Sequence, residues 1–373
     1  MMTSILIAAL GMAHAQTPEV DISGYVAPAF KAIYRPSARP VDQQRIGMDG
    51  SRAGIIFQGN VTNPWRYRIH MVVGGESFQA LTSATPVDGD NNGTTDAIRT
   101  QSSAALQNIV EEATTSYYPI EQFNLRVGRM RIPFTSQAQS PNTKLMFPER
   151  SGPNEVFLRG TDLGGLMETN LFSDRILGSI GVFNGTGAGV SDEDQRGILY
   201  TARIDINPLG SFGFNETSEW KGPFRMGIGA GLIHNPYTAY DSSGYPTVSV
   251  SDQRGSLSGR LAFYGLYVSG EYLIREQLDS MSQRPEWATG WYGQTGWHLP
   301  LGFEPVFRMG EVVQDESFDP RTTQWIDAGL NFYPAQASDR PDRVKLTVHY
   351  LLEDRLSEGE RAQGVSALTQ VTW

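Results

Sequence analysis

The chain has 373 residues, a formal net charge of −10, 19% charged residues and no cysteine. The acidic balance argues against a nucleic-acid-binding protein, and the lack of cysteine excludes disulfides and Cys-ligated metal sites. After residue 15, no apolar run reaches the roughly 18 residues of a membrane-spanning helix, so a helical membrane protein is excluded as well.

Residues 1–15 have the pattern of a signal peptide. An apolar core from Ile5 to Ala13 precedes Ala13-His14-Ala15, which matches the A-x-A cleavage site of exported proteins. A buried N-terminal segment is the alternative. We expect the mature chain to begin at Gln16 and to be exported.

From residue 20 onward, apolar and polar residues alternate with a period of two. In "WRYRIHMVV" (65–73) and "RVKLTVHYLLE" (343–353), one face is largely apolar or aromatic and the other is largely charged or polar. Such segments have the roughly 9–11 residue length of a tilted transmembrane β-strand. Sixteen strands are predicted, near residues 21–34, 51–60, 65–75, 113–119, 123–131, 162–171, 175–184, 198–207, 222–233, 256–264, 266–275, 287–297, 302–313, 323–333, 343–354 and 364–373.

The connections between these strands alternate between short turns and long loops. Bacterial outer-membrane barrels have short turns at one rim, long loops at the other and an even strand count. We therefore predict an all-β fold, a single antiparallel transmembrane β-barrel of about 16 strands over residues 16–373. A soluble sandwich would need a second sheet over its apolar face. The predicted long loops lie near residues 35–50, 76–112, 132–161, 185–197, 234–255, 276–286 and 355–363.

The chain ends in "SALTQVTW", a strand that leaves Trp373 uncovered unless lipid surrounds it. In a barrel, this last strand pairs with the first strand and removes the exposed edge. A terminal aromatic residue also resembles the signal that the barrel assembly machinery reads, although phenylalanine is commoner there.

Basic residues concentrate in 123–160, which covers the fifth predicted strand and the third long loop. Strict alternation places Arg129 on the lipid face, where a charge costs about 2–4 kcal/mol at the bilayer midplane. We therefore expect a bulge at Gly128 or a position close to the rim. A solvated loop with rim arginines is the alternative. The basic residues of this segment are Arg126, Arg129, Arg131, Lys144, Arg150 and Arg159.

The same part of the chain carries three motifs in order, "GRMRIPF" (128–134), "MFPERS" (146–151) and "GVFNGTG" (181–187). Together they resemble the phosphate-selective porin O and P family. The resemblance implies a homotrimer of sixteen-stranded barrels with the third loop folded into each lumen. It also implies passive diffusion with a preference for anions such as phosphate.

In that family the constriction and the pore wall carry lysine and arginine, and rings of such residues favour anions. The resemblance gives this role to the basic residues of 123–160. The scarcity of lysine departs from the family's pattern and weakens the assignment of phosphate. Alternation adds inward cations at Arg66, Arg68, Arg203, Arg225, Arg308 and Lys345. It also points acidic residues inward, at Asp205, Glu271, Glu304, Asp327 and Glu353.

The segment "DGDNNGTTD" (88–96) matches half of a calcium-binding loop. Its candidate ligands are Asp88, Asp90, Asn92 and Asp96, but Arg99 stands where a bidentate glutamate is required. A solvated loop is the alternative, so we assign neither a metal nor a cofactor. Residues 95–113 are compatible with a short helix.

The predicted external loops collect acidic residues, and divalent cations could bridge them to lipopolysaccharide. Together with the predicted porin fold, this gives as expected partners outer-membrane lipid and lipopolysaccharide, small inorganic or organic anions, the barrel assembly machinery and further copies of the chain. These acidic residues are Asp88, Asp90, Asp96, Glu111, Glu112, Asp192, Glu193, Asp194, Glu358 and Glu360.

The function predicted is that of a porin in the outer membrane of a Gram-negative bacterium, a passive diffusion channel that is general or prefers anions. A non-conducting barrel, acting as an adhesin or as the anchor of an envelope complex, is the first alternative. A barrel enzyme is the second alternative, and it is disfavoured because no histidine lies in a nucleophile motif such as G-x-S-x-G. A secreted, soluble β-protein is the third alternative. The histidines of the mature chain are His70, His234, His298 and His349.

Overall fold

The computed structural model shows a closed antiparallel β-barrel of sixteen strands. Among the residues that it describes, no helix is long and apolar enough to cross a membrane. The described residues are 19–36, 43–48, 51–74, 81–87, 97–103, 109–185, 195–217, 219–240, 246–279, 284–316, 319–334 and 343–373.

Each of the sixteen predicted strands is present, so the predicted fold class is confirmed. The first barrel strand is β1 (Glu19–Ala27), continued by β2 (Ala29–Tyr34). The others are β4 (Arg52–Thr62), β5 (Trp65–Gly74), β8 (Val110–Ile120), β9 (Phe123–Arg131), β10 (Thr161–Leu171), β11 (Ile176–Phe183), β13 (Leu199–Ile206), β14 (Arg225–Tyr240), β15 (Pro246–Phe263), β16 (Leu266–Asp279), β17 (Arg284–Trp297), β18 (Phe303–Glu316), β19 (Asp319–Phe332), β20 (Val344–Arg355) and β21 (Glu360–Thr372).

The first and last strands close the barrel, as predicted. β1 pairs with β4 on one side, and on the other side its end meets β21, where Tyr25 lies opposite Thr372. Pro28 has no N–H to donate, which accounts for the break between β1 and β2. The backbone of Trp373 exchanges two hydrogen bonds with that of Gly24, at 3.0 and 3.2 Å, and this pair seals the seam.

The barrel is apolar outside and polar inside. On β20, Lys345 and His349 are each 5% exposed, whereas Leu346 and Val348 face outward with exposures of 37% and 54%. This arrangement confirms the predicted alternation and is the reverse of a soluble protein. An apolar outer band is stable against lipid, while the polar inner face needs water or polar partners in the lumen.

Several strands extend further than the sequence predicts. β14 and β15 have 16 and 18 residues, so most of the predicted loop 234–255 is strand, and β16 and β17 take up most of 276–286. Several outer positions along these extensions are polar, with His234 opposite Gln253 and Gln253 opposite Glu276. A strand that has left the bilayer needs no apolar outer face, so the apolar pattern ends before the strand does.

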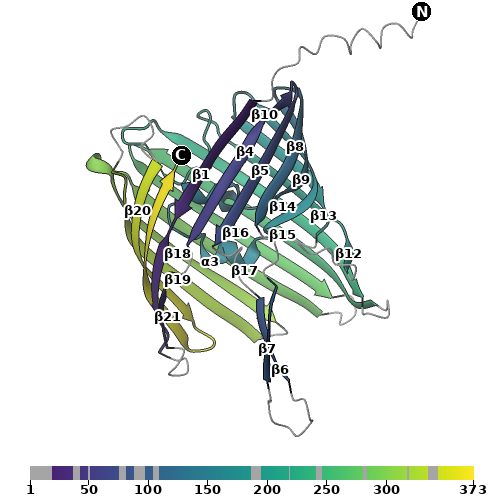
Figure 1. The fold of residues 1–373 in the computed structure, drawn as a ribbon, viewed down its shortest axis with the longest axis vertical. Helices are drawn as coiled ribbons and strands as arrows, with labels where there is room; N and C mark the ends of the chain where they lie inside the picture. Colours follow the sequence, from purple (N-terminus) through teal and green to yellow (C-terminus); the bar gives the residue numbers. More distant parts are fainter. Residues whose placement is uncertain are drawn as a thin grey trace, which may run out of the picture.

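Four short strands fall where loops are predicted. β3 (Gln44–Gly47) folds back on β2, and β12 (Gln195–Gly197) extends the pairing of β13 with β14. β6 (Leu81–Val87) and β7 (Ala97–Ser103) form a separate hairpin that projects beyond the barrel in Figure 1. The prediction of a helix over 95–113 is wrong, because its described parts are β7 and the start of β8. A short isolated helix is marginal, whereas pairing satisfies the backbone groups of a strand.

Residues 132–160, the predicted third loop, fold into the lumen as expected, and we call them the inserted loop. They contain α2 (Ser136–Gln139), the 3-10 turn η4 (Asn142–Lys144) and α3 (Gly152–Phe157). A further 3-10 turn, η5 (Pro300–Gly302), lies between β17 and β18. Figure 1 shows α3 within the outline of the barrel, behind the front strands.

Both α-helices of the inserted loop begin at a hydroxyl cap. The Thr135 side chain accepts a hydrogen bond from the N–H of Ala138 at 3.0 Å, and Ser151 accepts one from Asn154 at 3.3 Å. The loop also buries apolar side chains, because Phe134 packs in one cluster with inward-facing residues of the wall. The other members of this cluster are Met130, Ile132, Phe157, Leu166, Phe183, Leu199, Ile233, Leu273, Ala288 and Val312.

Candidate functional site

The inserted loop rests on the wall at its first turn. The backbone oxygen of Phe134 accepts hydrogen bonds from Arg203 Nη1 on β13, at 2.6 Å, and from Ser256 Oγ on β15, at 2.9 Å. On β14, between these two strands, Gly231 faces the same oxygen, and any side chain there would collide with it. The wall and the loop therefore touch at the backbone.

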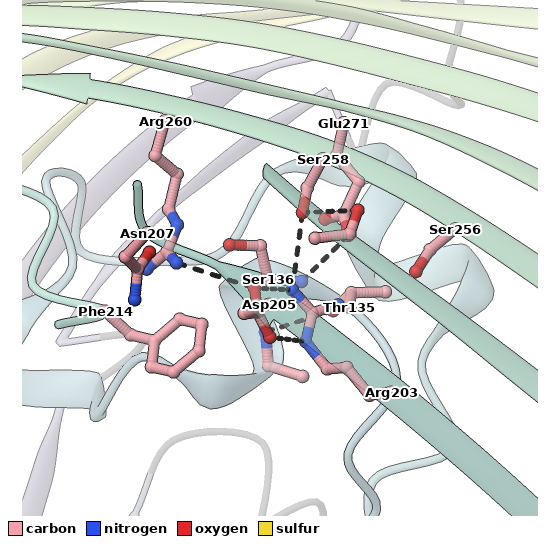
Figure 2. Close-up of polar contacts among 12 residues, drawn as sticks. Thr135, Ser136, Arg203, Asp205, Asn207, Phe214, Ser256, Ser258, Arg260 and Glu271 are labelled. Atoms are coloured by element: carbon pink, nitrogen blue, oxygen red, sulfur yellow. Dashed lines mark hydrogen bonds and ion pairs between the residues drawn. The ribbon is translucent and has the colours of Figure 1, made fainter. Parts of the chain in front are cut away.

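A buried charge cluster lies beside this contact (Figure 2). Arg203 Nε and Nη2 each lie 2.7 Å from one oxygen of Asp205, which makes a bidentate ion pair within β13. Arg260 on β15 brings a second cation to 3.5 Å from Asp205 and stacks on the Phe214 ring, 4.2 Å from its centre. The three charged side chains are 2–3% exposed. Because the three side chains are buried, Asp205 and not water offsets part of the charge of the two arginines.

Cations of β18 and β20 hold the other arm of the inserted loop. Lys345 Nζ donates to the backbone oxygens of Leu145 and Met146, at 2.6 and 3.0 Å. Arg308 Nη1 donates to the backbone oxygen of Glu149 at 2.9 Å. Both residues are predicted pore cations, and in the structure their charged groups are bound to carbonyls of the loop.

A buried carboxylate joins the two helices of the inserted loop to the wall. Glu271 on β16 accepts a hydrogen bond from the N–H of Ser136, the first residue of α2, at 2.8 Å. It also accepts one from Asn154 Nδ2 of α3 at 3.2 Å and one from the hydroxyl of Tyr292 at 3.3 Å. One acidic side chain thus fixes α2 and α3 relative to each other.

An accessible row of polar side chains crosses the wall of β1, β4, β5, β8, β9 and β10. Arg68 Nε lies 2.9 Å from Glu112 Oε2, and Arg126 Nη2 lies 2.7 Å from Glu168 Oε2. The side chains of Arg68 and Glu168 are 38% and 30% exposed, unlike the buried cluster at Arg203. We call this row the polar ladder, and it alternates in charge. Its members are Asp21, Gln58, Arg68, Glu112, Arg126 and Glu168.

Arg131 and Arg150, two further predicted cations, brace the inserted loop. Arg131 Nη1 donates to the oxygen of Ala138 at 3.0 Å, and the same guanidinium pairs with Glu111. Arg150 Nη2 donates to the oxygen of Ser140 at 3.0 Å. Burial, together with the charge of the nearby Arg131, lowers the pKa of Arg150 to about 10, so Arg150 stays a cation at neutral pH.

Three predicted cations lie apart from these groups. Arg66 lies over the ring of Tyr118, with its guanidinium carbon 4.2 Å from the ring centre. Arg159 Nη2 lies 3.0 Å from Asp252 Oδ2 on β15. Lys144 is half-buried in the inserted loop, and this burial lowers its pKa. The predicted cations therefore form no single ring within the described residues, because some line the accessible wall and others brace the loop.

Arg129 lies near the loop end of β9, opposite Leu163 of β10 and Ala113 of β8. Neither described pairing shifts its register at Gly128, so the prediction of a bulge there is wrong. Gly128 instead takes a φ of +129°, which glycine adopts readily. The other expectation, a position close to the end of the strand, agrees with the structure.

The predicted inward acids lie in the lumen, and two further acids join them. Glu353 pairs with Arg355 at the loop end of β20. Glu111 and Glu112, which are predicted in an external loop, lie on β8 and pair with lumen arginines. The prediction is wrong because β8 begins at Val110, earlier than its alternation indicates. The other inward acids are buried, with 0–7% of each residue exposed, and they are Asp205, Glu271, Glu304 and Asp327.

The sequence also fails to predict several lumen arginines among the described residues, including Arg52, Arg254 and Arg260. Arg52 donates to two backbone oxygens of the inserted loop, and Arg254 Nη1 donates to that of Phe157 at 2.6 Å. Arg260 belongs to the buried cluster. A signal is present in "SDQRGSLSGRLAF" (251–263), where these last two arginines share one face with serines.

A second segment enters the lumen, from the rim of the short turns, and the sequence does not predict it. Residues 207–224 join β13 to β14, and we call their described part, 207–217 and 219–224, the inner turn. Phe212 of this turn packs in a buried cluster with Met146 of the inserted loop. Arg225, a predicted pore cation, donates to the oxygen of Leu209 in the turn at 3.2 Å. Only the unusual length of this connection distinguishes it in the sequence.

Among the described residues, no group of three or more His, Cys, Asp or Glu side chains is placed to hold a metal. His70 and His349 lie on the lumen wall as predicted, and His70 Nδ1 is 3.2 Å from Glu111. The calcium candidates lie outside the described residues, and they are Asp88, Asp90, Asn92 and Asp96.

No family model and no curated protein matches the chain, so the resemblance to the phosphate-selective porin O and P family is not confirmed. Solved structures do match. OmpT of Vibrio cholerae has a TM-score of 0.59 at 10% identity, over 96% of this chain and 98% of OmpT. An anion-selective porin from Comamonas acidovorans has a TM-score of 0.55 at 12% identity, over 95% and 100%.

The outer membrane channel DcaP of Acinetobacter baumannii also matches, with a TM-score of 0.55 at 12% identity, over 95% of this chain and 97% of that one. At such identities the likeness shows the fold. The chain therefore has the porin fold, and its closed barrel with an apolar outer face is that of a protein of the Gram-negative outer membrane.

Proposed function

We propose that the protein is a porin, a passive diffusion channel for small hydrophilic solutes in the outer membrane. The observation that carries the proposal is the polar ladder, whose partly exposed side chains form hydrogen bonds and ion pairs with one another along the lumen wall. Fixed polar groups on a water-filled wall can replace part of a solute's hydration, and the narrowed lumen limits its size.

The finer proposal is a modest preference for anions. The accessible wall carries Arg66, Arg68 and Arg126, which attract anions, while Glu112 and Glu168 weaken their field. Most other predicted cations are bound to carboxylates or to carbonyls of the inserted loop. This pairing favours neutral and zwitterionic solutes beside anions, and it gives no particular support to phosphate.

We further propose that residues 1–15 are removed as a signal peptide, that the barrel assembly machinery inserts the chain, and that it forms a homotrimer among lipopolysaccharide. A trimer form of OmpT from Vibrio cholerae shares the fold. Sequencing the N-terminus of the membrane-extracted protein should find Gln16 first. Its mass in mild detergent should be three times that of the denatured chain.

The test of the channel is single-channel recording in a planar bilayer under a KCl gradient. Discrete conductance steps with a reversal potential on the anion side support both forms of the proposal. Conductance steps with a reversal potential of zero, or with one that shows cation selectivity, would support the porin function but contradict the anion preference.

The second candidate is a non-conducting barrel that serves as an adhesin or anchor. The specific observation in its favour is that the inserted loop and the inner turn meet and bury each other's side chains inside the lumen. An absence of steps from folded, heat-modifiable protein would favour this candidate over the channel.

A further inference from the structure

The inner turn and the inserted loop meet inside the barrel, although they enter from opposite rims. The N–H of Glu216 donates to the oxygen of Lys144 at 3.0 Å, and Ser140 Oγ donates to the oxygen of Phe214 at 2.5 Å. Glu216 is 2% exposed. The meeting point is therefore buried in the lumen and not at a mouth of the barrel.

The carboxylate of Glu216 bonds two separate arms of the inserted loop. Its Oε1 accepts a hydrogen bond from Gln137 Nε2 of α2 at 2.9 Å, and its Oε2 accepts one from the N–H of Met146 at 2.8 Å. Gln137 in turn accepts the N–H of Ser151, at the start of α3, at 2.8 Å. One side chain of the inner turn thus connects three stretches of the loop.

The inner turn is itself tied to the barrel, so Glu216 is not free to follow the loop. Arg260 Nη1 on β15 donates to the oxygen of Gly213 at 2.8 Å. At the start of the turn, Asn207 Nδ2 donates to the oxygen of Asp174 at 2.9 Å, in the neighbouring connection. The turn therefore transmits the position of the wall to the middle of the inserted loop.

We infer that Glu216 is a positioning residue of the constriction, which fixes the distance between the inserted loop and the polar ladder and so sets the largest solute that passes. This inference rests on the proposed channel function. The wall anchors at Phe134 and at residues 145–149 hold the two arms of the loop separately. Glu216 joins those arms to each other and prevents them from spreading.

Glu216→Gln tests this inference, because a glutamine offers one acceptor oxygen and one donor amide where two acceptors are needed. Glu219→Gln is the matched control, since it removes the same charge from the same turn at an exposed position. We expect single-channel conductance and the size limit for neutral polyethylene glycols to shift upward in Glu216→Gln, and both to stay at the wild-type value in Glu219→Gln.

Amide hydrogen exchange gives a readout that does not depend on conduction. Loss of a bond to a buried charged acceptor should make the amide of Met146 exchange about ten- to a hundredfold faster. Ser140→Ala, which removes the bond to Phe214, should act in the same direction and serves if Glu216→Gln does not fold.

The outcomes separate the two proposals. Faster exchange with a larger conductance supports the inference. If Glu216→Gln and Ser140→Ala both show wild-type amide exchange and wild-type conductance, the inference about Glu216 is overturned and the proposed channel function is unaffected. Faster exchange in a protein that never conducts, wild type included, overturns the channel and with it the role of Glu216 in sizing solutes.

Discussion

Arg203 and Asp205 lie two positions apart on β13, point into the same lumen and share two contacts of 2.7 Å. Both side chains are almost fully buried, so water cannot compensate either charge once its partner is removed. The pair also carries the inserted loop, because Arg203 donates to the oxygen of Phe134. One ion pair therefore links the stability of the wall to the position of the loop.

Asp205→Asn should destabilise the barrel by about 3–5 kcal/mol, because Arg203 and Arg260 would become buried cations that share no carboxylate. This loss can be measured by urea unfolding in lipid vesicles, with the folded fraction monitored as the heat-modifiable band in gel electrophoresis. Arg355→Ala is the control, since its pair with Glu353 is exposed and should be worth no more than about 1 kcal/mol. Equal losses for the two variants would contradict the role assigned to burial.

Neighbouring members of the polar ladder should move ion selectivity in opposite directions. Arg126→Gln removes a cation from the accessible wall and should shift the reversal potential toward cations, while Glu168→Gln should shift it toward anions. Both side chains are partly exposed, at 27% and 30%, so the mobile ions feel the change. Shifts of the same sign, or none, under a KCl gradient would show that ions pass elsewhere.

Gly231→Ala should displace the start of the inserted loop and leave the barrel formed. The new methyl group would collide with the oxygen of Phe134, at a cost of about 1–3 kcal/mol for overpacking. Gly259→Ala on β15 is the control, because the same added carbon meets open space among the described residues. Thermal unfolding should separate the two variants, and equal melting temperatures would argue against the close contact.

Lys345→Met should loosen the arm of the inserted loop that contains Lys144. The buried ammonium group donates to the oxygens of Leu145 and Met146. Asn331 Nδ2 also donates to the oxygen of Met146, at 3.0 Å, so the substitution orphans the carbonyl of Leu145, at a cost of about 1–3 kcal/mol. Trypsin should then cleave after Lys144 about tenfold faster or more, while the barrel stays intact. Lys221→Met, at an exposed site of the inner turn, should leave the cleavage rate unchanged. Wild-type digestion of Lys345→Met would refute the anchor.

The wall of the barrel could be predicted because each strand has two faces, and the bilayer requires apolar residues on the face that points outward. β9 has the predicted bounds, and Leu125 and Val127 on its outer face, next to the short turn at 121–122, are apolar. The rule fails where strands leave the lipid, as at His234 and Gln253 on β14 and β15. There the outer face is polar, but the ladder of backbone hydrogen bonds continues.

The interior was predictable only in part. Alternation correctly turns Arg308 and Lys345 inward, but it carries no information about what meets them across the lumen. Both bind backbone oxygens of a loop about 160–200 residues earlier in the chain, a relation that no local pattern encodes. The inner turn escapes prediction for the same reason, because the partners of Glu216 are distant in sequence.

The bonds that fix the inserted loop have a consequence for the order of folding. Lys345 and Gln370 bind oxygens of the loop that lie 200 and 227 residues away along the chain. Contacts of such separation form late, because the intervening chain must first lose its freedom. The oxygens of Leu145 and Thr143 gain these donors only when β20 and β21 have joined the sheet. We therefore expect the wall to form first and the inserted loop to reach its final position last.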